Sequence, residues 1–483
     1  MTDEEALFAA IRADPENDTP RLAYADWLDA NVGERRPSPL RKSSRTTKIQ
    51  PASGSERAEY IRVDCSLVQL QEAAQLWDVK ARIRELTARE RQLRPAVVKA
   101  WEAPFRNGKP FRGRCGGFTF DRGIPQGVKL SGGEAENYGE AILRRAPIHT
   151  FQLHSMSPLG LARILRCRWL RNLAAMWIRL DDQANPQHRV DLSQFAEARH
   201  AQHLTTLTMK KGWTLSPDGA DQLAHCTSLP ALRRLELWSP STGAAGFARL
   251  FDGPAFRQLT DLWIVGLPFR PGELAALLAS PALAALNQLV IWESLLDGVA
   301  GEALAQSAAW RNLWRLDLSR GFGSDDKSGP VGGAWAALEA ASPGKLEWLA
   351  LPRDRLGDPE AASLTRWPIW HSLHYLELGG NPRITPTGWA QIIDALAAGS
   401  IRYLRLGSCS ITDEVAAQLA CAPQLASLET LILWRTPITD AGAIALAESR
   451  YLGAVEYLSV SDCPIGRVGR RKLEDRFGNA VHF

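Results

Sequence analysis

Residues 428–447 read "LETLILWRTPITDAGAIALA", and this stretch contains two periodicities, one after the other. Its first six residues run apolar, two variable, apolar, one variable, apolar, as in a short β-strand with one buried face. Thr439 and Asp440 then precede alanines and leucines at helical spacing, where Thr439 suits the N-cap and Asp440 the first turn. The stretch therefore predicts a strand followed by a helix.

The same strand pattern recurs along most of the chain. The twelve copies begin at Ile148, Leu173, Leu204, Leu232, Leu259, Leu286, Leu313, Leu346, Leu373, Ile401, Leu428 and Val455. Six of the eleven intervals between them are 27 residues long. A fixed period of about 20–50 residues predicts a solenoid, in which each unit buries its leucines against its neighbours.

The pattern resembles the leucine-rich repeat family, LxxLxLxxN/C, and most closely its ribonuclease-inhibitor-like type. Asn381, Cys409 and Cys463 occupy the N/C position, whereas Pro240 and Asp354 depart from it. The resemblance implies an α/β solenoid in the form of a horseshoe, with a parallel sheet inside and helices outside. The two longest intervals predict irregular loops at 181–194 and 319–335, either functional loops or tolerated insertions.

Aromatic residues collect at the variable strand positions, which alternation places on the concave side of the horseshoe. They supply nine of the 36 positions, or 25%, against 8% aromatic residues in the whole chain. The predicted partner-binding residues are Trp177, Trp238, Trp263, Trp292, Arg315, Trp348, Tyr375, Tyr403, Arg405, Trp434 and Tyr457. Trp and Tyr are the residues that most often dominate interfaces. The alternative is that strands favour aromatic residues and that the rings fill the inside of a tight curve.

Charges in the same positions are mixed, with Arg234 and Arg405 beside Glu236 and Glu377, for example. A mixed face suits a protein or peptide better than a phosphate backbone. We therefore predict a protein-interaction scaffold that binds a protein or peptide on its concave face.

The N-terminal third has a different organisation. We expect a helical domain over 1–115 with a disordered basic insertion at 35–55, then a β-cap over 116–147. The repeats are expected over 148–470 and a C-terminal cap over 471–483. Helices are expected from Thr2, which forms a capping box with Glu5, and from Pro20. In the second helix Leu22, Trp27 and Leu28 should pack, and Arg21 should face solvent.

Two blocks of this region are similar to the repeat-companion domain that accompanies leucine-rich repeats in planctomycete bacteria. They are "MTDEEALFAAIRADPENDTPRLAYADWLDANVGE" at the N-terminus and "RAEYIRVDCSL" from Arg57, with "FDRG" from Phe120 as a looser match. The family joins the two blocks almost directly, so 35–55 is a departure from it. The resemblance implies no established activity.

Other functions have weaker support. Tyr24, Asp26 and Asp29 lie close together in the sequence, but no nucleophile, histidine or catalytic motif accompanies them, so we predict no enzyme and no cofactor or metal site. Nucleic-acid binding by the basic N-terminal region is the alternative, because all the excess of the +4 net charge lies in residues 1–150. Seven scattered cysteines and no secretory or membrane segment predict a cytoplasmic protein with reduced thiols.

Overall fold

The computed structural model divides the chain into two compact units, Met1–Trp213 and Thr214–Phe483. The structure describes residues 2–31, 51–72, 77–106, 116–179, 189–239, 247–267, 269, 272–294, 296–320, 332–341, 344–396 and 400–483. Most of the predicted basic insertion and most of the two predicted loops lie outside these residues. The division falls within the repeats, and the domain limits expected from the sequence remain predictions.

The first unit begins with helices and continues into a sheet. Its elements are α1 (Asp3–Ala13), α2 (Asp18–Asn31), α3 (Gly54–Glu72), α4 (Trp77–Arg106), β1 (Gly116–Asp121), β2 (Ile124–Ser131), α5 (Gly132–Arg145), β3 (Thr150–His154), α6 (Pro158–Leu165), η1 (Arg168–Asn172), β4 (Ala175–Arg179), β5 (Val190–Asp191), η3 (Leu192–Glu197) and β6 (Thr206–Lys210). β7 (Trp213–Thr214) lies at the division between the units. β1 pairs antiparallel with β2, and β2, β3, β4 and β6 follow in parallel.

The N-terminal helices partly follow the sequence prediction. Thr2 and Glu5 form the expected capping box of α1. The second helix begins at Asp18, however, and not at Pro20. The prediction that Arg21 faces solvent was also wrong, since Arg21 is 1% exposed and pairs with Asp121 at 3.0 Å. A partner 100 residues away in the sequence is invisible to a helical periodicity.

The turn between β1 and β2 is only two residues long. It lies at Arg122 and Gly123, with Ile124 and Pro125 inside β2. Arg122 and Gly123 both have positive φ, at 45° and 76°. This left-handed pair makes a tight two-residue connection and leaves the following apolar residues free to enter the sheet.

His149, just before β3, gives the first unit a predicted pH dependence. Burial lowers the pKa of its imidazole to about 4, as does the charge of Arg21, and Glu16 opposes the shift. Between about pH 4 and the ordinary value of 6.5 the folded state binds fewer protons than the unfolded chain, so stability falls as the pH falls. We expect about 2 kcal/mol to be lost from about pH 7 to about pH 5. In His149→Gln, denaturant-dependent hydrogen exchange of the β3 amides should show this loss greatly reduced, and an unchanged loss would contradict the assignment.

The second unit repeats a strand and a helical segment. Its strands are β8 (Arg234–Trp238), β9 (Asp261–Val265), β10 (Gln288–Trp292), β11 (Arg315–Asp317), β12 (Trp348–Ala350), β13 (Tyr375–Glu377), β14 (Tyr403–Arg405), β15 (Thr430–Ile432), β16 (Tyr457–Ser459) and β17 (Val481–His482). The α-helices are α7 (Pro217–Ala224), α8 (Glu273–Leu278), α9 (Gly298–Gln306), α10 (Gly332–Ala341), α11 (Asp358–Leu364), α12 (Pro386–Ala395), α13 (Asp413–Cys421), α14 (Asp440–Glu448) and α15 (Arg467–Phe477).

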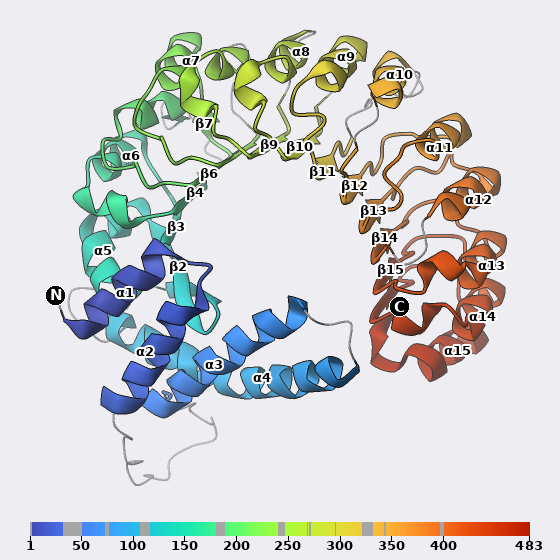
Figure 1. Cartoon of the computed structure of the whole chain (residues 1–483), viewed down its shortest axis with the longest axis horizontal. Coiled ribbons are helices and arrows are strands. Elements are labelled where there is room, and N and C mark those ends of the chain that lie inside the picture. The colour runs from blue at the N-terminus through green and yellow to red at the C-terminus, as the bar shows by residue number, and fades with distance from the viewer. Residues whose placement is uncertain are drawn as a thin grey trace. The chain divides into compact units, whose positions relative to one another are not determined.

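The strands of the second unit form a parallel sheet. In Figure 1 the helices of this unit lie along one face of the sheet. Each of the twelve predicted copies contains one strand, counted over both units, which confirms the repeat solenoid. The second residue of each strand from β8 to β16 is a leucine, such as Leu349, Leu376 and Leu431, and this leucine is buried under the helices. Burial of one leucine side chain stabilises the fold by about 1.5–3 kcal/mol, so each added repeat adds to the hydrophobic stabilisation of the solenoid.

The helical halves of the repeats are less uniform than the strands. After β4 and after β8 the only helical segments among the described residues are 3₁₀ turns, η3 (Leu192–Glu197) and then η4 (Ala248–Phe251) with η5 (Pro254–Phe256). The later repeats, in contrast, carry the expected α-helices. The N-cap prediction holds for Thr439, whose side chain accepts from the N–H of Ala441. Thr412 takes the N-cap position without a side-chain hydrogen bond.

The aspartate in the first helical turn also joins successive repeats. Asp413 accepts hydrogen bonds from the N–H and the hydroxyl of Thr439, at 2.7 and 2.6 Å, and from the N–H of Gly442. Burial raises the pKa of Asp413, but these hydrogen bonds outweigh it and lower the pKa overall. Asp358 binds Thr385 in the same way. The aspartate at the start of one helix thus holds the N-cap threonine of a following helix.

The N/C position of the repeats forms a buried polar ladder. Asn381 is fully buried, and Cys409 and Cys463 donate to the carbonyls of Leu378 and Leu433 at 3.2 and 3.1 Å. Thr436 fills the same place with its hydroxyl, 2.7 Å from the Leu433 carbonyl. A short hydroxyl can thus replace asparagine or cysteine here.

Candidate binding site

The inner face is the sheet surface of β8 to β16 on the side away from the helices, and its side chains form three rows. The first row is Arg234, Asp261, Gln288, Arg315, Trp348, Tyr375, Tyr403, Thr430 and Tyr457. The second row is Glu236, Trp263, Val290, Asp317, Ala350, Glu377, Arg405, Ile432 and Ser459. The third row is two residues further on, at Trp238, Val265, Trp292, Ser319, Pro352, Gly379, Gly407, Trp434 and Ser461.

Ten of the eleven predicted partner-binding residues lie in these rows, and Trp177 lies on β4 of the first unit. Trp177, Tyr403 and Tyr457 are each 40% exposed, whereas Tyr375 is only 7% exposed. The others are partly buried: Trp238, Trp263, Trp292, Arg315, Trp348, Arg405 and Trp434. Most of these side chains thus present an edge to solvent and keep the rest against a neighbour.

Arginines and aromatic rings alternate along the middle of the inner face. The guanidinium of Arg315 lies between two indoles, 4.8 Å from the ring centroid of Trp263 and 4.4 Å from that of Trp348. Trp348 in turn stacks on Tyr375 with ring centroids 3.5 Å apart. Burial lowers the pKa of Arg315, and the charge of Asp317 opposes this shift. The rings and guanidinium groups therefore pack on one another across strands.

A polar cluster continues this stack on the next strands. The hydroxyl of Tyr375 donates to Glu377 at 2.7 Å, and Arg405 donates to that hydroxyl at 3.0 Å and to Glu377 at 3.4 Å. Burial raises the pKa of Tyr375, and so does the charge of Glu377. These contacts fix Arg405 in place and neutralise its charge.

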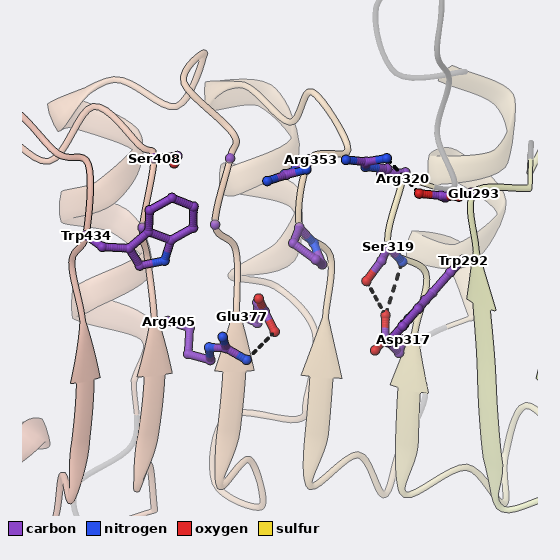
Figure 2. Close-up of a pocket in the computed structure, with 14 residues that line it drawn as sticks. Trp292, Glu293, Asp317, Ser319, Arg320, Arg353, Glu377, Arg405, Ser408 and Trp434 are labelled. Carbon is purple, nitrogen blue, oxygen red and sulfur yellow. Dashed lines mark hydrogen bonds and ion pairs between the residues drawn. The ribbon is translucent and has the colours of Figure 1, made fainter. Parts of the chain in front are cut away.

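A pocket of about 320 Å³ opens on the inner face over β10 to β15 (Figure 2). Trp292 and Trp434 stand on its two sides, and Asp317, Glu377 and Arg405 line it from the second row. The remaining lining residues are Glu293, Ser319, Arg320, Pro352, Arg353, Gly379, Gly380, Gly407 and Ser408.

Asp317 is the most buried acid of the pocket, at 5% exposed. Burial raises the pKa of its carboxyl group, while hydrogen bonds from the N–H and hydroxyl of Ser319, at 3.1 and 2.5 Å, act in the opposite direction. Its carboxylate is thus already engaged within its own repeat.

The rim of the pocket is formed by residues in the left-handed conformation. Glu293, Arg320, Arg353 and Ser408 have φ between 55° and 62°, and Gly380 has φ of 75°. Each follows directly after the third row, and its N–H donates to the carbonyl of the next third-row residue, as from Arg353 to Gly379 at 2.8 Å. The recurring turn directs side chains of the rim away from the strand ladder. Sequence reasoning missed these residues, because their composition carries no signal for a positive φ.

In the first unit the residues considered for catalysis serve as structural contacts. Asp26 and Asp29 both pair with Arg62, at 2.7 and 2.8 Å. The hydroxyl of Tyr24 donates to Glu4 at 3.0 Å, and its ring is fully buried. Within the described part of the chain, no group of three His, Cys, Asp or Glu side chains could hold a metal ion.

The basic helix α4 carries ion pairs on its surface. They are Arg82 with Glu85, Arg89 with Glu59 and Arg94 with Glu90. These pairs reduce the positive charge that the helix offers to a nucleic acid. The rest of that interpretation depended on residues 35–55, of which 35–50 lie outside the described residues.

The repeat that contains residues 428–447 matches a known family. Residues 424–447 match the Leucine Rich repeat family. Together with the twelve strand units, this match shows that the chain contains leucine-rich repeats. No curated protein sequence matches the chain. None of the helices within the described ranges is long and apolar enough to cross a membrane.

Three solved structures are similar to parts of this chain. An internalin from Listeria monocytogenes is 15% identical, over 70% of this chain and 87% of its own, with a TM-score of 0.40. The Rad7 and Elc1 complex from yeast gives 16% identity, over 83% and 93%, with a TM-score of 0.48. A leucine-rich repeat protein from Leptospira interrogans gives 15% identity, over 70% and 90%, with a TM-score of 0.29.

Proposed function

We propose that the protein is a scaffold without catalytic activity, which binds a protein or peptide partner on the inner face of the second unit. The observation that carries this proposal is the combination of partly exposed aromatic edges with a mixed-charge pocket on one rigid sheet. Rigid aromatic residues lose little entropy on binding and are favoured at the centres of interfaces.

The rigidity has a clear source in the stacks themselves. Arg315 is held between Trp263 and Trp348, so these side chains are already ordered before a partner arrives. Preorganisation lowers the entropy cost of association. The packing of the rings on each other is therefore compatible with both interpretations of the aromatic residues. It suits a surface that binds a partner, and it suits rings that fill the inside of a tight curve.

A triple substitution tests the proposal. We expect Trp263→Ala, Trp292→Ala and Trp348→Ala together to weaken the affinity for a partner by at least about tenfold, because interface tryptophans commonly contribute more than 1 kcal/mol each. The partner is first captured from native cells with the wild-type chain, then purified, and its affinity for each variant is measured by isothermal titration.

The matched control lies on the helical side of the second unit. Val299 and Val468 are 61% and 59% exposed on α9 and α15, so Val299→Ala with Val468→Ala should leave the affinity unchanged. Circular dichroism must show that the triple variant keeps its fold. Retained affinity in a folded triple variant would refute binding through this face.

We also propose that the N-terminal helices form the companion-type domain that the sequence resembles. Its three matching blocks contact one another in the first unit: Arg62 of the second block pairs with Asp26 of the first, and Arg21 of the first pairs with Asp121 of "FDRG". The six cysteines within the described residues are free, which supports a reducing compartment such as the cytoplasm.

A further inference from the structure

The pocket exists because the third row lacks large side chains in its middle. Between Trp292 and Trp434 this row consists of Ser319, Pro352, Gly379 and Gly407. A Cβ atom on Gly407 would lie 2.3 Å from the indole nitrogen of Trp434, so this ring rests on the backbone of Gly407. The main chain of the two glycines therefore forms the floor of the pocket.

Gly379 and Gly407 both line the pocket, and their N–H groups differ from the N–H group of Ser319, the equivalent residue after β11. The N–H of Ser319 donates to the side chain of Asp317, two residues earlier, on the inner face. The residue two positions before Gly379 is Glu377, and its carboxylate already accepts hydrogen bonds from Tyr375 and Arg405.

Two residues before Gly407 is Arg405, which offers no acceptor group. Among the described residues, neither the N–H of Gly379 nor that of Gly407 donates a hydrogen bond. In the repeats of β13 and β14, the backbone N–H at this position is therefore without an acceptor. In the β11 repeat, the same N–H binds the carboxylate of Asp317.

Three carboxylates and three guanidinium groups line the pocket, so its formal charges balance, but the carboxylate of Asp317 is already bound by Ser319. Arg320 pairs with Glu293 at 2.6 Å, and Arg405 pairs with Glu377 at 3.4 Å. Within the described residues, the side chain of Arg353 has no ion pair or hydrogen bond. A Cβ atom on Gly380 would lie 2.5 Å from Cγ of Arg353, so this side chain runs over Gly380 along the rim (Figure 2).

We propose that this pocket binds a carboxylate group of an extended peptide, held by the N–H groups of Gly379 and Gly407 and by the guanidinium of Arg353. Backbone N–H groups with an arginine are a recurrent carboxylate-binding combination. Trp292 and Trp434 then pack on the flanking peptide residues. Five strand spacings separate these tryptophans, at most roughly 24 Å, which about seven extended residues span. The inference rests on the proposed function and names the chemistry of its partner.

Three short peptides that differ only in their carboxylates test this inference with the full chain. The probes are acetyl-Ala-Ala-Glu-Ala-Ala-amide, the same peptide with Gln in place of Glu, and acetyl-pentaalanine with a free C-terminus. Binding is measured by saturation-transfer NMR at physiological salt up to millimolar peptide. We expect the glutamine amide not to bind and at least one carboxylate peptide to bind. The Glu peptide and the free-acid peptide distinguish a side-chain carboxylate from a C-terminal one.

Variants of the rim test the role of Arg353. Arg353→Gln should weaken the carboxylate peptide by about tenfold or more, since a charge-assisted hydrogen bond is worth about 1.5–3 kcal/mol. Arg353→Lys should recover part of the loss. Arg383→Gln is the matched control, because Arg383 is exposed in a neighbouring loop outside the pocket. Gly379→Ala, checked for an unchanged melting temperature, should also weaken binding by adding a Cβ 3.0 Å from the carbonyl of Gly407.

Several results would overturn the inference: no binding of either carboxylate peptide, equal binding of the Glu and Gln peptides, or full affinity in Arg353→Gln. The proposed function fails in a different experiment. A purified partner that loses affinity for the triple tryptophan variant but not for Arg353→Gln would remove the carboxylate pocket and keep the inner face as the binding surface.

Discussion

Replacing Gly123 with alanine is expected to destabilise the first unit by at least about 4 kcal/mol, because two separate costs add at this residue. Gly123 has φ of 76°, a conformation that L-residues rarely adopt. An alanine Cβ would also lie 2.5 Å from Cα and 2.9 Å from N of Ile61, so it meets backbone that has to move. That movement would separate the β1–β2 turn from α3.

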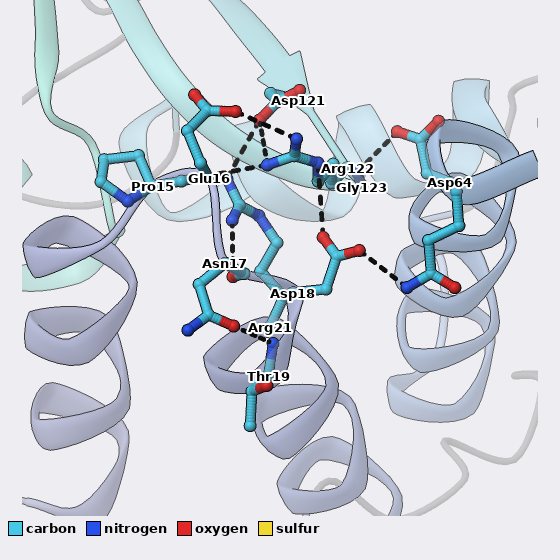
Figure 3. Close-up of polar contacts among 11 residues, drawn as sticks. Pro15, Glu16, Asn17, Asp18, Thr19, Arg21, Asp64, Asp121, Arg122 and Gly123 are labelled. Atoms are coloured by element: carbon cyan, nitrogen blue, oxygen red, sulfur yellow. Dashed lines mark hydrogen bonds and ion pairs between the residues drawn. The ribbon is translucent and has the colours of Figure 1, made fainter. Parts of the chain in front are cut away.

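The polar contacts around this turn make the movement costly (Figure 3). The N–H of Gly123 donates to Asp64 at 2.6 Å, while Arg122 pairs with Glu16 and Asp18. A displaced turn breaks these contacts together, and Arg122, which is 12% exposed, loses Glu16 and Asp18 as partners.

Urea unfolding of the wild type and Gly123→Ala, followed by hydrogen exchange of the α2 and α3 amides, measures this loss. Gly133→Ala is the matched control, since a Cβ there has no atom within 4 Å and Gly133 lies in the first turn of α5. We expect its stability to stay within about 0.5 kcal/mol of the wild type or to rise slightly. Equal effects of the two substitutions would contradict the clash at Ile61.

The same turn shows where sequence reasoning reached its limit. The strand starts were predictable because each copy repeats its own local pattern, and the strand over Thr430–Ile432 depends only on leucines two residues apart. The burial of Arg21 depends instead on Asp121, which no local periodicity connects to it. Contacts between segments far apart in the sequence determine how the helices and strands of the first unit pack, so this packing was the least predictable part of the fold.

In the candidate site, too, some residues were predictable from the sequence and others were not. Strand alternation predicted three rows of side chains on one face, and the register of the sheet aligns their members, with Arg315 beside Trp348 and Arg405 beside Glu377. The run of small residues between Trp292 and Trp434 was also readable from the repeat alignment and could have indicated the pocket. The placement of Arg353 could not, because it follows from a left-handed backbone and from the absence of a side chain at Gly380.

Replacing Asn381 with alanine is expected to destabilise the second unit by about 4 kcal/mol, since each buried polar group left without a partner costs about 1–3 kcal/mol. The side-chain amide of Asn381 donates to the carbonyls of Leu351 and Leu378, both at 2.8 Å. Its oxygen accepts from the N–H groups of Asp354 and Leu356, at 3.0 and 3.1 Å. One side chain thus satisfies four backbone groups in two successive repeats.

The comparison with Cys409→Ala separates this network from the simple loss of volume. Cys409 occupies the same position one repeat later, equally buried, but donates only one weak hydrogen bond, to Leu378. We expect its substitution to cost about 1 kcal/mol, a quarter of the effect at Asn381. Urea unfolding followed by hydrogen exchange of the β12 and β13 amides measures both. If the two variants lost equal stability, cavity formation and not the unpaired backbone groups would be the cause, because both substitutions leave a small void in the same layer of the core.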